Sequence, residues 1–248
     1  MDLVERQRGH GVRHPWETAR AEAIRKLVAR LDLPTPTVLD VGCGDGFLIA
    51  QLRAHLELRA AVAQDVHLTP ELARELAQPG VEFVRDLDQL RERRFDLVLL
   101  LDVLEHVQEP GALLTRLSRE HLTPGGRLLI TVPAFQALFS EHDRALQHVR
   151  RYSRSEIAAL VRDTGLAVHA AGYLFSSLLL PRAISTLRER LWPPRPQPVI
   201  GVGAWSGPPW LTRSLHQLLC ADNRLCLKAQ EKGLIVPGLS AWILCSAR

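Results

Sequence analysis

The chain has 248 residues, of which 46% are hydrophobic and 23% are charged, and its formal net charge is +4. This length allows one substantial α/β core with an elaboration, and the composition is that of a soluble globular protein. The basic residues are scattered and form no stripe with interleaved aromatic residues, which argues against nucleic acid as a partner. The four cysteines form no Cys-x-x-Cys pair, so we expect a cytoplasmic setting without a disulfide framework.

No segment of the sequence has the length and apolarity of a membrane-spanning helix. The first thirteen residues are charged and lack an apolar signal core. The longest apolar run, near 174–180, is interrupted by serines, stops at Pro181 and is too short to cross a bilayer. We expect a soluble protein that at most lies on the inner face of a membrane.

The first two thirds of the chain alternate between helical and strand-like patterns. Apolar residues at helical spacing predict a helix over 16–31, which Pro34 and Pro36 end. Aliphatic runs separated by helices then predict a parallel sheet that is covered on both faces. The expected strands cover 37–41, 59–63, 81–84, 95–101 and 127–132, and the expected helices cover 47–55, 70–77 and 110–121.

A polar, histidine-rich segment that ends near Tyr152 interrupts this alternation. Ser153 and Glu156 then form a capping-box pattern for a helix that runs to Arg162. The remaining pattern predicts a strand over 166–171, an amphipathic helix within 173–192, a proline-rich linker, a helix near 211–230 and a final strand over 240–246.

The strongest local pattern lies where the first strand ends. Asp40 closes that strand, and a Gly-x-Gly-x-Gly loop over 42–46 leads directly into a helix. Glycines allow unusual dihedrals and close ligand approach, and the helix N-terminus offers free amides to an anionic group. A nicotinamide-binding loop would have its third glycine one position later, where Phe47 stands. The spacing favours another nucleoside ligand, and a plain tight turn is the alternative.

Acidic residues also follow the next two strands. Asp65 follows the second strand, where a carboxylate can accept hydrogen bonds from ribose hydroxyls, and Asp86 follows the third, where it can hold an adenine edge. Either aspartate alone would be an ordinary turn or cap residue. Together they lie at the carboxyl edge of the sheet, where doubly wound folds bind ligands.

Four segments in order resemble the class I S-adenosylmethionine-dependent methyltransferases. They are Val-Leu-Asp-Val-Gly-Cys-Gly-Asp-Gly at 38–46, Phe-Asp-Leu-Val at 95–98, Asp-Val-Leu-Glu-His-Val at 102–107 and Leu-Thr-Pro-Gly-Gly-Arg-Leu at 122–128. The resemblance covers about 37–172 and implies S-adenosylmethionine as the cofactor. The cofactor contacts that we expect are Asp40, Gly42, Cys43, Gly44, Asp65, Val66, Asp86, Leu87, Leu101 and Asp102.

The resemblance also implies the fold. It is an α/β, Rossmann-like, doubly wound sheet of seven strands, the last antiparallel, with helices on both faces. The family usually joins its last two strands by a short connection, whereas here the connection runs over 174–239. We therefore expect a mostly helical insertion that caps the substrate side or contacts a partner. The expected parts are an N-terminal helical lid (1–36), a cofactor-binding core (37–173), the insertion (174–238) and a final core strand (239–248).

The chain is similar, more narrowly, to a bacterial branch of these enzymes that often occurs beside glycosyltransferases and cell-surface polysaccharide functions. The similarity lies in His14-Pro15-Trp16, with Pro15 in place of an aromatic residue, and in Ser-Glu-His-Asp at 140–143 followed by a basic segment at 148–152. This branch has few defined acceptors, so the similarity says little about the substrate, and a small-molecule acceptor and a glycan or lipid-linked one both stay open. The substrate-binding candidates are Trp16, Arg150, Arg151 and Tyr152.

Methylation of a hydroxyl requires a base or a metal that removes the proton. His142 and His148, with Asp143, are the candidate catalytic residues; the alternative is that they belong to a solvated polar loop. A possible divalent-metal site is Asp102 with Glu105 and His106, because this spacing resembles the pattern of ubiquinone-type and small-RNA O-methyltransferases, and a downstream histidine would complete it. In metal-free relatives His106 would only pack at a helix start.

The expected activity is methyl transfer to a small or glycan-like acceptor at a hydroxyl oxygen. Transfer to carbon or nitrogen, a nicotinamide dehydrogenase and a non-catalytic cofactor-binding scaffold are the alternatives. The amphipathic stretch over 173–192, with arginines at 182, 188 and 190, offers a face for a peripheral membrane contact or a lipid-linked acceptor, unless it packs on the core.

Overall fold

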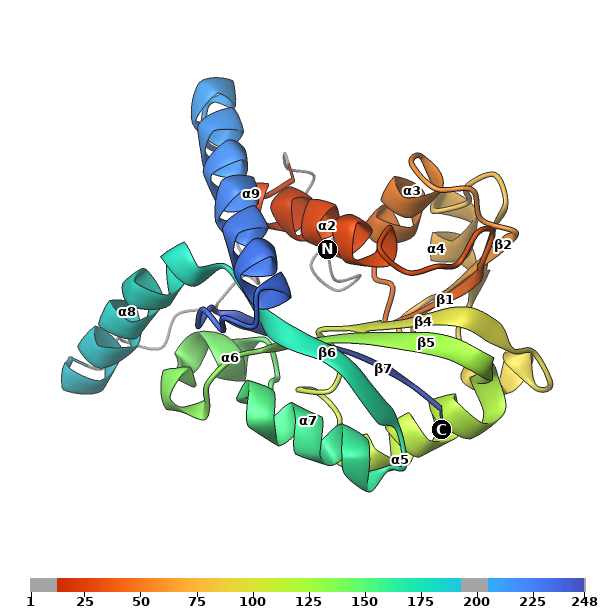
Figure 1. Cartoon of the computed structure of the whole chain (residues 1–248). Coiled ribbons are helices and arrows are strands. Elements are labelled where there is room, and N and C mark those ends of the chain that lie inside the picture. The colour runs from red at the N-terminus through yellow and green to blue at the C-terminus, as the bar shows by residue number, and fades with distance from the viewer. Residues whose placement is uncertain (1–12, 193–204, 248) are drawn as a thin grey trace.

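A computed structural model describes residues 13–192 and 205–247. Over these residues the chain forms one seven-stranded sheet with the strand order β3-β2-β1-β4-β5-β7-β6 (Figure 1). The first five strands are parallel, whereas β7 runs antiparallel to both of its neighbours, β5 and β6. The strands are β1 (Thr37–Val41), β2 (Ala60–Gln64), β3 (Val81–Val84), β4 (Phe95–Leu101), β5 (Leu122–Pro133), β6 (Ala167–Leu174) and β7 (Ser240–Ser246).

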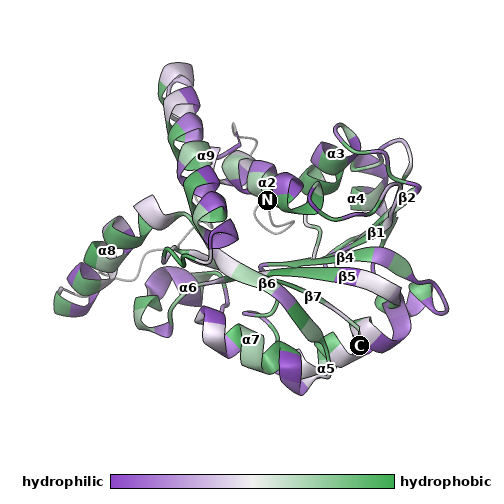
Figure 2. Cartoon of the chain, viewed as in Figure 1, coloured by the Kyte–Doolittle hydropathy of each residue, from purple (hydrophilic) through white to green (hydrophobic). Residues whose placement is uncertain are grey.

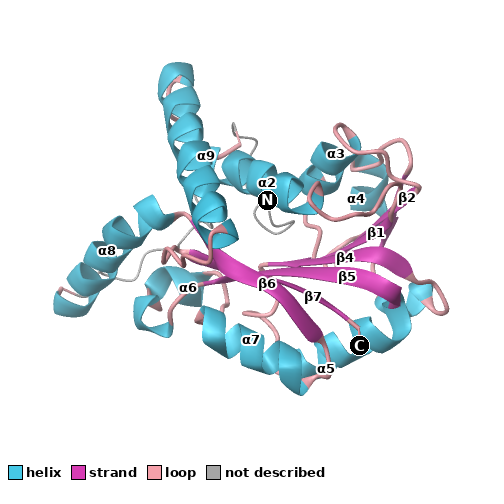
Figure 3. Cartoon of the chain, in the orientation of Figure 1, coloured by secondary structure: helices cyan, strands magenta, loops and turns pink. Residues whose placement is uncertain are grey.

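Helices cover both faces of this sheet (Figures 1 and 3). The central strands are aliphatic and buried on both sides, so each face supplies one hydrophobic core. Helices α2 (Pro15–Val28), α3 (Phe47–Arg53) and α9 (Pro209–Glu231) contribute to one core, and α5 (Pro110–Arg116) and α7 (Arg154–Asp163) contribute to the other. The remaining helices are α4 (Pro70–Glu75), α6 (Glu141–Ala145) and α8 (Leu179–Leu191), with short turns at Leu87–Leu90, Leu117–His121, Gln136–Leu138 and Ser176–Leu178.

This architecture confirms the predicted fold class, including the antiparallel last strand and the helical insertion before it. The doubly wound strand order reverses between β1 and β4, and such a reversal opens a ligand crevice at the carboxyl ends of the two strands. The glycine loop follows β1 directly. The fold therefore positions this loop at the expected ligand site.

The element boundaries differ from the sequence-based expectation in several places. Strand β5 begins at Leu122, five residues before the expected start at Arg127. The predicted helix over 110–121 ends as α5 at Arg116 and continues as a π turn. The predicted amphipathic helix within 173–192 starts only at Leu179, because Tyr173 and Leu174 pair with β7 and extend β6. The polar segment before Tyr152 contains a short helix, α6, that the pattern did not indicate.

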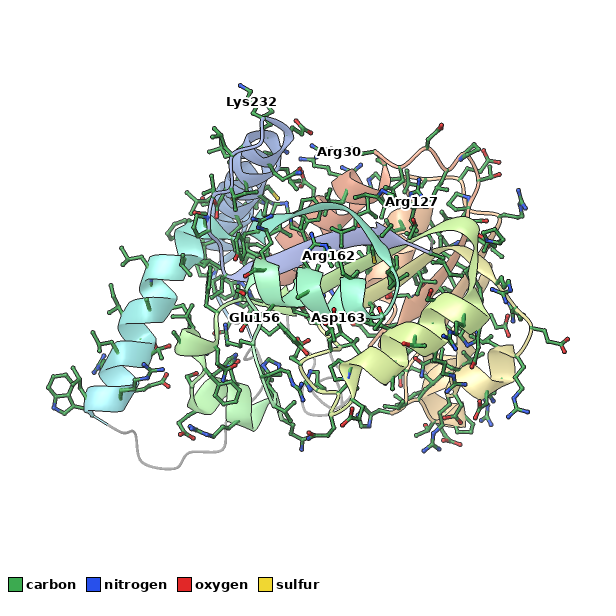
Figure 4. The ribbon with its side chains drawn as sticks, turned by 60° about the horizontal axis from the view of Figure 1, so that its bottom comes forward. Arg30, Arg127, Glu156, Arg162, Asp163 and Lys232 are labelled. Atoms are coloured by element: carbon green, nitrogen blue, oxygen red, sulfur yellow. The ribbon has the colours of Figure 1, made fainter. Side chains whose placement is uncertain are left out.

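The described part of the insertion contains two helices, α8 and α9, that leave the sheet in different directions. Helix α9 packs along α2, whereas α8 stands away from the sheet in two views (Figures 1 and 4). Asn223 fastens α9 in place, because its side-chain oxygen accepts the Phe175 amide at 2.9 Å just after β6. The predicted proline-rich linker lies mostly outside the described residues. Among the described helices none has the length and apolarity of a membrane span.

Hydropathy follows this arrangement. The strands are predominantly apolar, and the helices alternate between apolar and polar residues (Figure 2). In Figure 4, Glu156 and Asp163 mark the two ends of α7, the helix that covers β6 and β7. Ser153 caps α7 through the predicted box, because its hydroxyl accepts the Glu156 amide and the Glu156 carboxylate accepts the Ser153 amide.

Candidate cofactor and acceptor site

The glycine loop after β1 is held in a conformation that only glycines adopt easily. Gly42, Gly44 and Gly46 have φ angles of 72°, 54° and 71°. The Gly42 amide donates to the Gln64 carbonyl at 2.8 Å, so the loop turns back over the end of β2. A Cβ on Gly42 would lie 2.5 Å from a methyl carbon of Val103. The loop after β4 thus closes directly on the glycine loop, and this cradle suits a ligand that approaches the backbone closely.

Asp65 ties the glycine loop to the end of β2. Its Oδ2 accepts the Gly44 amide at 3.0 Å, and its Oδ1 accepts the His67 amide at 2.9 Å. The carboxylate is almost fully buried and each oxygen keeps a second lone pair. A carboxylate oriented in this way can accept hydrogen bonds from ribose hydroxyls, which is the role that the sequence predicts for Asp65.

Asp40 and Asp102 lie at the ends of the two strands that flank the switch point. Burial, together with the charge of Asp65, raises the pKa of Asp40 to about 7 in spite of the nearby guanidinium of Arg20. Asp102 has a φ of 57°, and its carboxylate contacts Arg20 at 2.8 Å and accepts the Thr131 hydroxyl at 2.9 Å. Arg20 belongs to α2, so the N-terminal helix supplies the positive charge at this acidic edge.

The other predicted cofactor contacts have varied surroundings. Cys43 is buried, and burial raises the pKa of its thiol. Val66 is exposed, whereas Leu87 and Leu101 are buried. Asp86 caps the short helix over Leu87–Leu90. All lie at or just after the carboxyl end of β1, β2, β3 or β4, and their contact with the cofactor stays a prediction.

The segment before α2 reaches the glycine loop, a contact that the sequence analysis missed. Arg13 pairs with the buried Asp45, and its guanidinium lies 3.9 Å from the ring centroid of Phe47. Trp16 packs against Phe175, with ring centroids 5.7 Å apart. Phe47 directly follows the glycine loop in the sequence, but Arg13 lies far before it. Only the fold shows that Arg13 contacts this loop.

A second polar cluster surrounds Asp143, the buried residue of α6. His148 Nδ1 lies 2.9 Å from Asp143 Oδ1, Arg151 Nε donates to the same oxygen at 2.8 Å, and Arg182 donates to Oδ2 at 2.9 Å. Burial opposes ionisation, but these partners outweigh it and hold the pKa of Asp143 well below its usual range. Because the carboxylate is ionised, the proton of the neutral imidazole lies on His148 Nδ1 and the lone pair lies on Nε2.

His148 also approaches the loop after β4. One potential ligand atom from each of Glu105, His106 and His148 lies within 4.8 Å of the others, and the rings of His106 and His148 are 4.7 Å apart. Glu105 is fully buried, and neither of its carboxyl oxygens has a hydrogen-bond partner among the described residues. Burial and the charge of Asp102 raise the pKa of Glu105 well above its usual value.

The structure brings only some of the remaining candidates to this cluster. Asp102 is engaged with Arg20, so the three potential metal ligands include Glu105 and His106 but not Asp102. Burial and Arg182 lower the pKa of His142, which favours its neutral form. Arg151 and Tyr152 are buried with internal partners, and Arg150 donates to the Gln108 carbonyl at 3.0 Å. Their roles as substrate contacts stay predictions.

A strand-order reversal with a glycine loop and acidic strand ends is the arrangement of the nucleoside-binding, Rossmann-like α/β enzymes. The profile of a family described as "Methyltransferase domain" matches residues 16–171, and the chain belongs to this family. It is an S-adenosylmethionine-dependent methyltransferase.

Individual relatives agree with this assignment. The chain is 33% identical over 189 residues to the ubiquinone biosynthesis O-methyltransferase of Xanthomonas oryzae pv. oryzae (strain PXO99A), covering 66% of this chain and 77% of that one. An O-methyltransferase family protein from Burkholderia thailandensis is 26% identical, with a TM-score of 0.51 over 62% of this chain and 53% of that one. A geranyl diphosphate methyltransferase solved with its cofactor has the same fold, with a TM-score of 0.58, 15% identity and coverage of 94% and 86%.

The close approach at Gly42 predicts a specific loss of cofactor binding. In Gly42→Ala the new methyl group would collide with Val103, so we expect at least a tenfold weaker affinity for S-adenosylhomocysteine in titration calorimetry. Gly125→Ala is the matched control, because Gly125 also has a positive φ, of 78°, but has nothing within 4 Å of the added Cβ. Equal affinities of the two variants would contradict the role of the cradle.

The raised pKa of Asp40 predicts a pH-dependent stability. The unfolded chain releases this proton near the ordinary value of 3.8, but the folded protein keeps it up to about pH 7. The folded state therefore binds more protons over this window, and the free energy of unfolding falls as the pH rises from about 4 to about 7.

In Asp40→Asn this contribution disappears, and we expect the decline in urea-unfolding free energy to be smaller by on the order of a few kcal/mol. Glu105 titrates in the same direction in both proteins, so the difference between them isolates Asp40. The same decline in both proteins would exclude Asp40 as its source.

Proposed function

We propose that this methyltransferase methylates a hydroxyl oxygen of a small-molecule acceptor and that the Asp143–His148 pair receives the hydroxyl proton. The carrying observation is the 2.9 Å contact between His148 Nδ1 and the ionised Asp143 carboxylate, beside the loop that follows β4. Asp143 fixes the tautomer and orientation of the imidazole, as the carboxylate does in other histidine-based catalytic pairs. His148 Nε2 is then the proton acceptor.

Each residue group has a distinct part in this proposal. S-adenosylmethionine, when bound, supplies a methyl group on a sulfonium leaving group. Gly42 and Gly44 pack against its methionine part, Asp65 binds the ribose, Asp86 contacts the adenine and Asp40 orders the loop. The protein's remaining task is alignment of the acceptor and removal of one proton.

The acceptor class is inferred from two kinds of observation. Curated relatives are named O-methyltransferases of ubiquinone biosynthesis, which supports a hydroxyl acceptor. Trp16 at the start of α2 and Arg150 near the histidines are partly exposed and are the proposed acceptor contacts. A glycan or lipid-linked hydroxyl is the second acceptor class that we propose.

A divalent metal at Glu105, His106 and His148 is the alternative way to activate the hydroxyl. The unpartnered carboxyl of Glu105 and its closeness to the two imidazoles fit such an ion, which would lower the pKa of a bound hydroxyl. Glu105 is the only acidic group of these three ligands, and the guanidinium groups of Arg151 and Arg182, both bound to Asp143, add positive charge beside it, which opposes a divalent ion. We therefore favour the base without a metal.

The proposal predicts the behaviour of His148→Ala. Methyl transfer would be screened with labelled cofactor on catechols, polyprenyl phenols and nucleotide sugars, and kcat on the best acceptor should fall by about 10²–10⁴-fold in the variant. Affinity for S-adenosylhomocysteine should stay unchanged, and His55→Ala, a substitution of an exposed histidine that follows α3, is the matched control.

Three results would count against parts of this proposal. Full turnover of His148→Ala would remove the base, and transfer only to nitrogen or carbon acceptors would remove O-methylation. Activity lost on exhaustive chelation and restored by magnesium would support the metal at Glu105 instead of the base.

We further propose that α8 lies on an anionic membrane surface and presents the active site to an acceptor held there. The orientation of this helix is the supporting observation. Its polar side faces the protein: Arg182 donates to Ser140 and Asp143, and Arg190 donates to the Ala137 carbonyl at 2.7 Å. Its only buried residue is a threonine, Thr186.

The apolar side of α8 faces outward. Leu180, Ile184, Leu187 and Leu191 recur at helical spacing and are between 58% and 67% exposed, and Trp192 follows them. Arg188 is exposed beside this stripe. The only acidic residue of the helix, Glu189, accepts hydrogen bonds from the Glu141 amide and the Ser185 hydroxyl, away from the stripe. An apolar stripe edged by arginine and free of carboxylates matches the charge of an anionic lipid surface.

Vesicle sedimentation tests this orientation. The wild-type protein should bind phosphatidylglycerol vesicles more tightly than phosphatidylcholine vesicles, and Ile184→Ser with Leu187→Ser should weaken binding at least tenfold. Leu218→Ser with Leu225→Ser is the matched control, because these two leucines are equally exposed but lie on α9. Equal loss in both double variants, or no vesicle binding by the wild type, would exclude the α8 surface.

A further inference from the structure

A cluster of three potential metal ligands joins the N-terminal helix to the insertion, far along the sequence from the Asp143 cluster. His216 and Cys220 lie one turn apart on α9, and Glu22 lies opposite them on α2. Cys220 Sγ is 3.0 Å from Glu22 Oε2 and 3.5 Å from His216 Nε2, and His216 Nε2 is 3.7 Å from Glu22 Oε2. A thiol, an imidazole and a carboxylate therefore point at one small volume.

The hydrogen bonds around His216 determine which ring nitrogen faces this volume. Thr18 has a single hydroxyl proton, which it donates to the Pro15 carbonyl at 3.0 Å. Its oxygen must then accept from His216 Nδ1, 2.9 Å away. The lone pair of the neutral imidazole is consequently on Nε2, which faces Cys220 and Glu22. Such an outer hydrogen bond, which fixes the tautomer, commonly supports metal-bound histidines.

The spacing of the three atoms suits a tetrahedral ion. Zinc binds sulfur at about 2.3 Å and nitrogen or oxygen at about 2.0–2.2 Å, so neighbouring ligand atoms of a tetrahedral site lie about 3.3–3.6 Å apart. The observed separations of 3.0, 3.5 and 3.7 Å require shifts of about half an ångström, the largest being an opening of the pair between the Cys220 sulfur and Glu22 Oε2. Glu22 and His216 are partly exposed, which leaves room for water as a fourth ligand.

The neighbouring cations contact the other oxygen of the carboxylate. Lys26 Nζ and Arg224 Nη2 lie 2.7 and 2.9 Å from Glu22 Oε1, and Oε2 remains directed at the thiol. Burial would raise the pKa of Glu22, but Lys26, Cys220 and Arg224 outweigh it and hold this pKa at about 2. The carboxylate is thus ionised, whereas burial and Glu22 raise the pKa of Cys220 to about 12.

We propose that Glu22, His216 and Cys220 form a zinc site that clips helix α9 of the insertion to helix α2. On binding, the thiol releases its proton to solvent and the thiolate takes its place in the coordination shell. The thiolate and the carboxylate bring two negative charges to the ion, and the carboxylate shares its charge with Lys26 and Arg224 through Oε1. The site contains a sulfur ligand, which distinguishes it from the oxygen and nitrogen atoms of Glu105, His106 and His148.

The clip has a defined place in the molecule. Its ligand Glu22 lies two residues after Arg20, which contacts Asp102 at the cofactor edge. At the far end of the same helix pair, Arg30 bonds to Glu231 at 2.7 Å, and Figure 4 shows Arg30 and Lys232 on that side of the molecule. A metal at the middle of this interface would hold the insertion and the N-terminal helix as one unit.

Cobalt spectroscopy on the full chain tests the proposal directly. After metal removal, titration with Co²⁺ should give one equivalent with a thiolate-to-cobalt charge-transfer band and the visible bands of a tetrahedral ion. Cys220→Ala should lose the charge-transfer band, and His216→Ala should bind at least tenfold more weakly. Cys226→Ala, a buried cysteine of the same helix, is the matched control and should keep the band.

Thermal unfolding provides an independent readout. Zinc should raise the Tm of the wild type and of Cys226→Ala but not that of Cys220→Ala. The absence of a thiolate band in folded wild type, or its persistence in Cys220→Ala, would overturn the site. Neither result bears on methyl transfer, so the clip and the proposed function fail separately.

Discussion

The hydrogen bond between the Gly44 amide and the Asp65 carboxylate is the constraint on which the cofactor edge depends. It joins the loop after β1 to the end of β2, while Gly42 packs against Val103 from the loop after β4. Three strand ends are thereby fixed relative to one another before any ligand arrives. A preorganised site of this kind loses little entropy on binding, which favours tight capture of a nucleoside.

The sheet could be predicted from the sequence because each of its central strands is a short, continuous aliphatic run. A strand such as β4 is buried on both faces along its aliphatic run from Leu97 to Leu101, and few other structures accept such a run between polar loops. The start of α8 could not be found in this way. Tyr173 and Leu174 continue an apolar pattern into the helix, and only their pairing with β7 assigns them to β6.

The candidate site likewise has a part that the sequence predicts and a part that it does not. Glycines and carboxylates at strand ends are local signals, so the loop at 42–46 and Asp65 were accessible from the sequence. Contacts between distant segments were not: Arg20 reaches Asp102 from α2, and Arg182 reaches Asp143 from the insertion. Both arginines looked like ordinary charges of amphipathic helices. Their importance depends on tertiary packing, which no spacing rule contains.

Helix α8 has two different faces: Arg182 lies on the face toward the protein, and the exposed leucines lie on the other. The Arg182 guanidinium reaches inward to the carboxylate that orients His148, while the leucines of the same helix point away from the protein. A rotation or displacement of the helix at its outer face would withdraw one of the two arginines that bind the Asp143 carboxylate. For the surface attachment of α8 that we propose, linkage requires that the attachment and the Arg182–Asp143 contact each alter the free energy of the other.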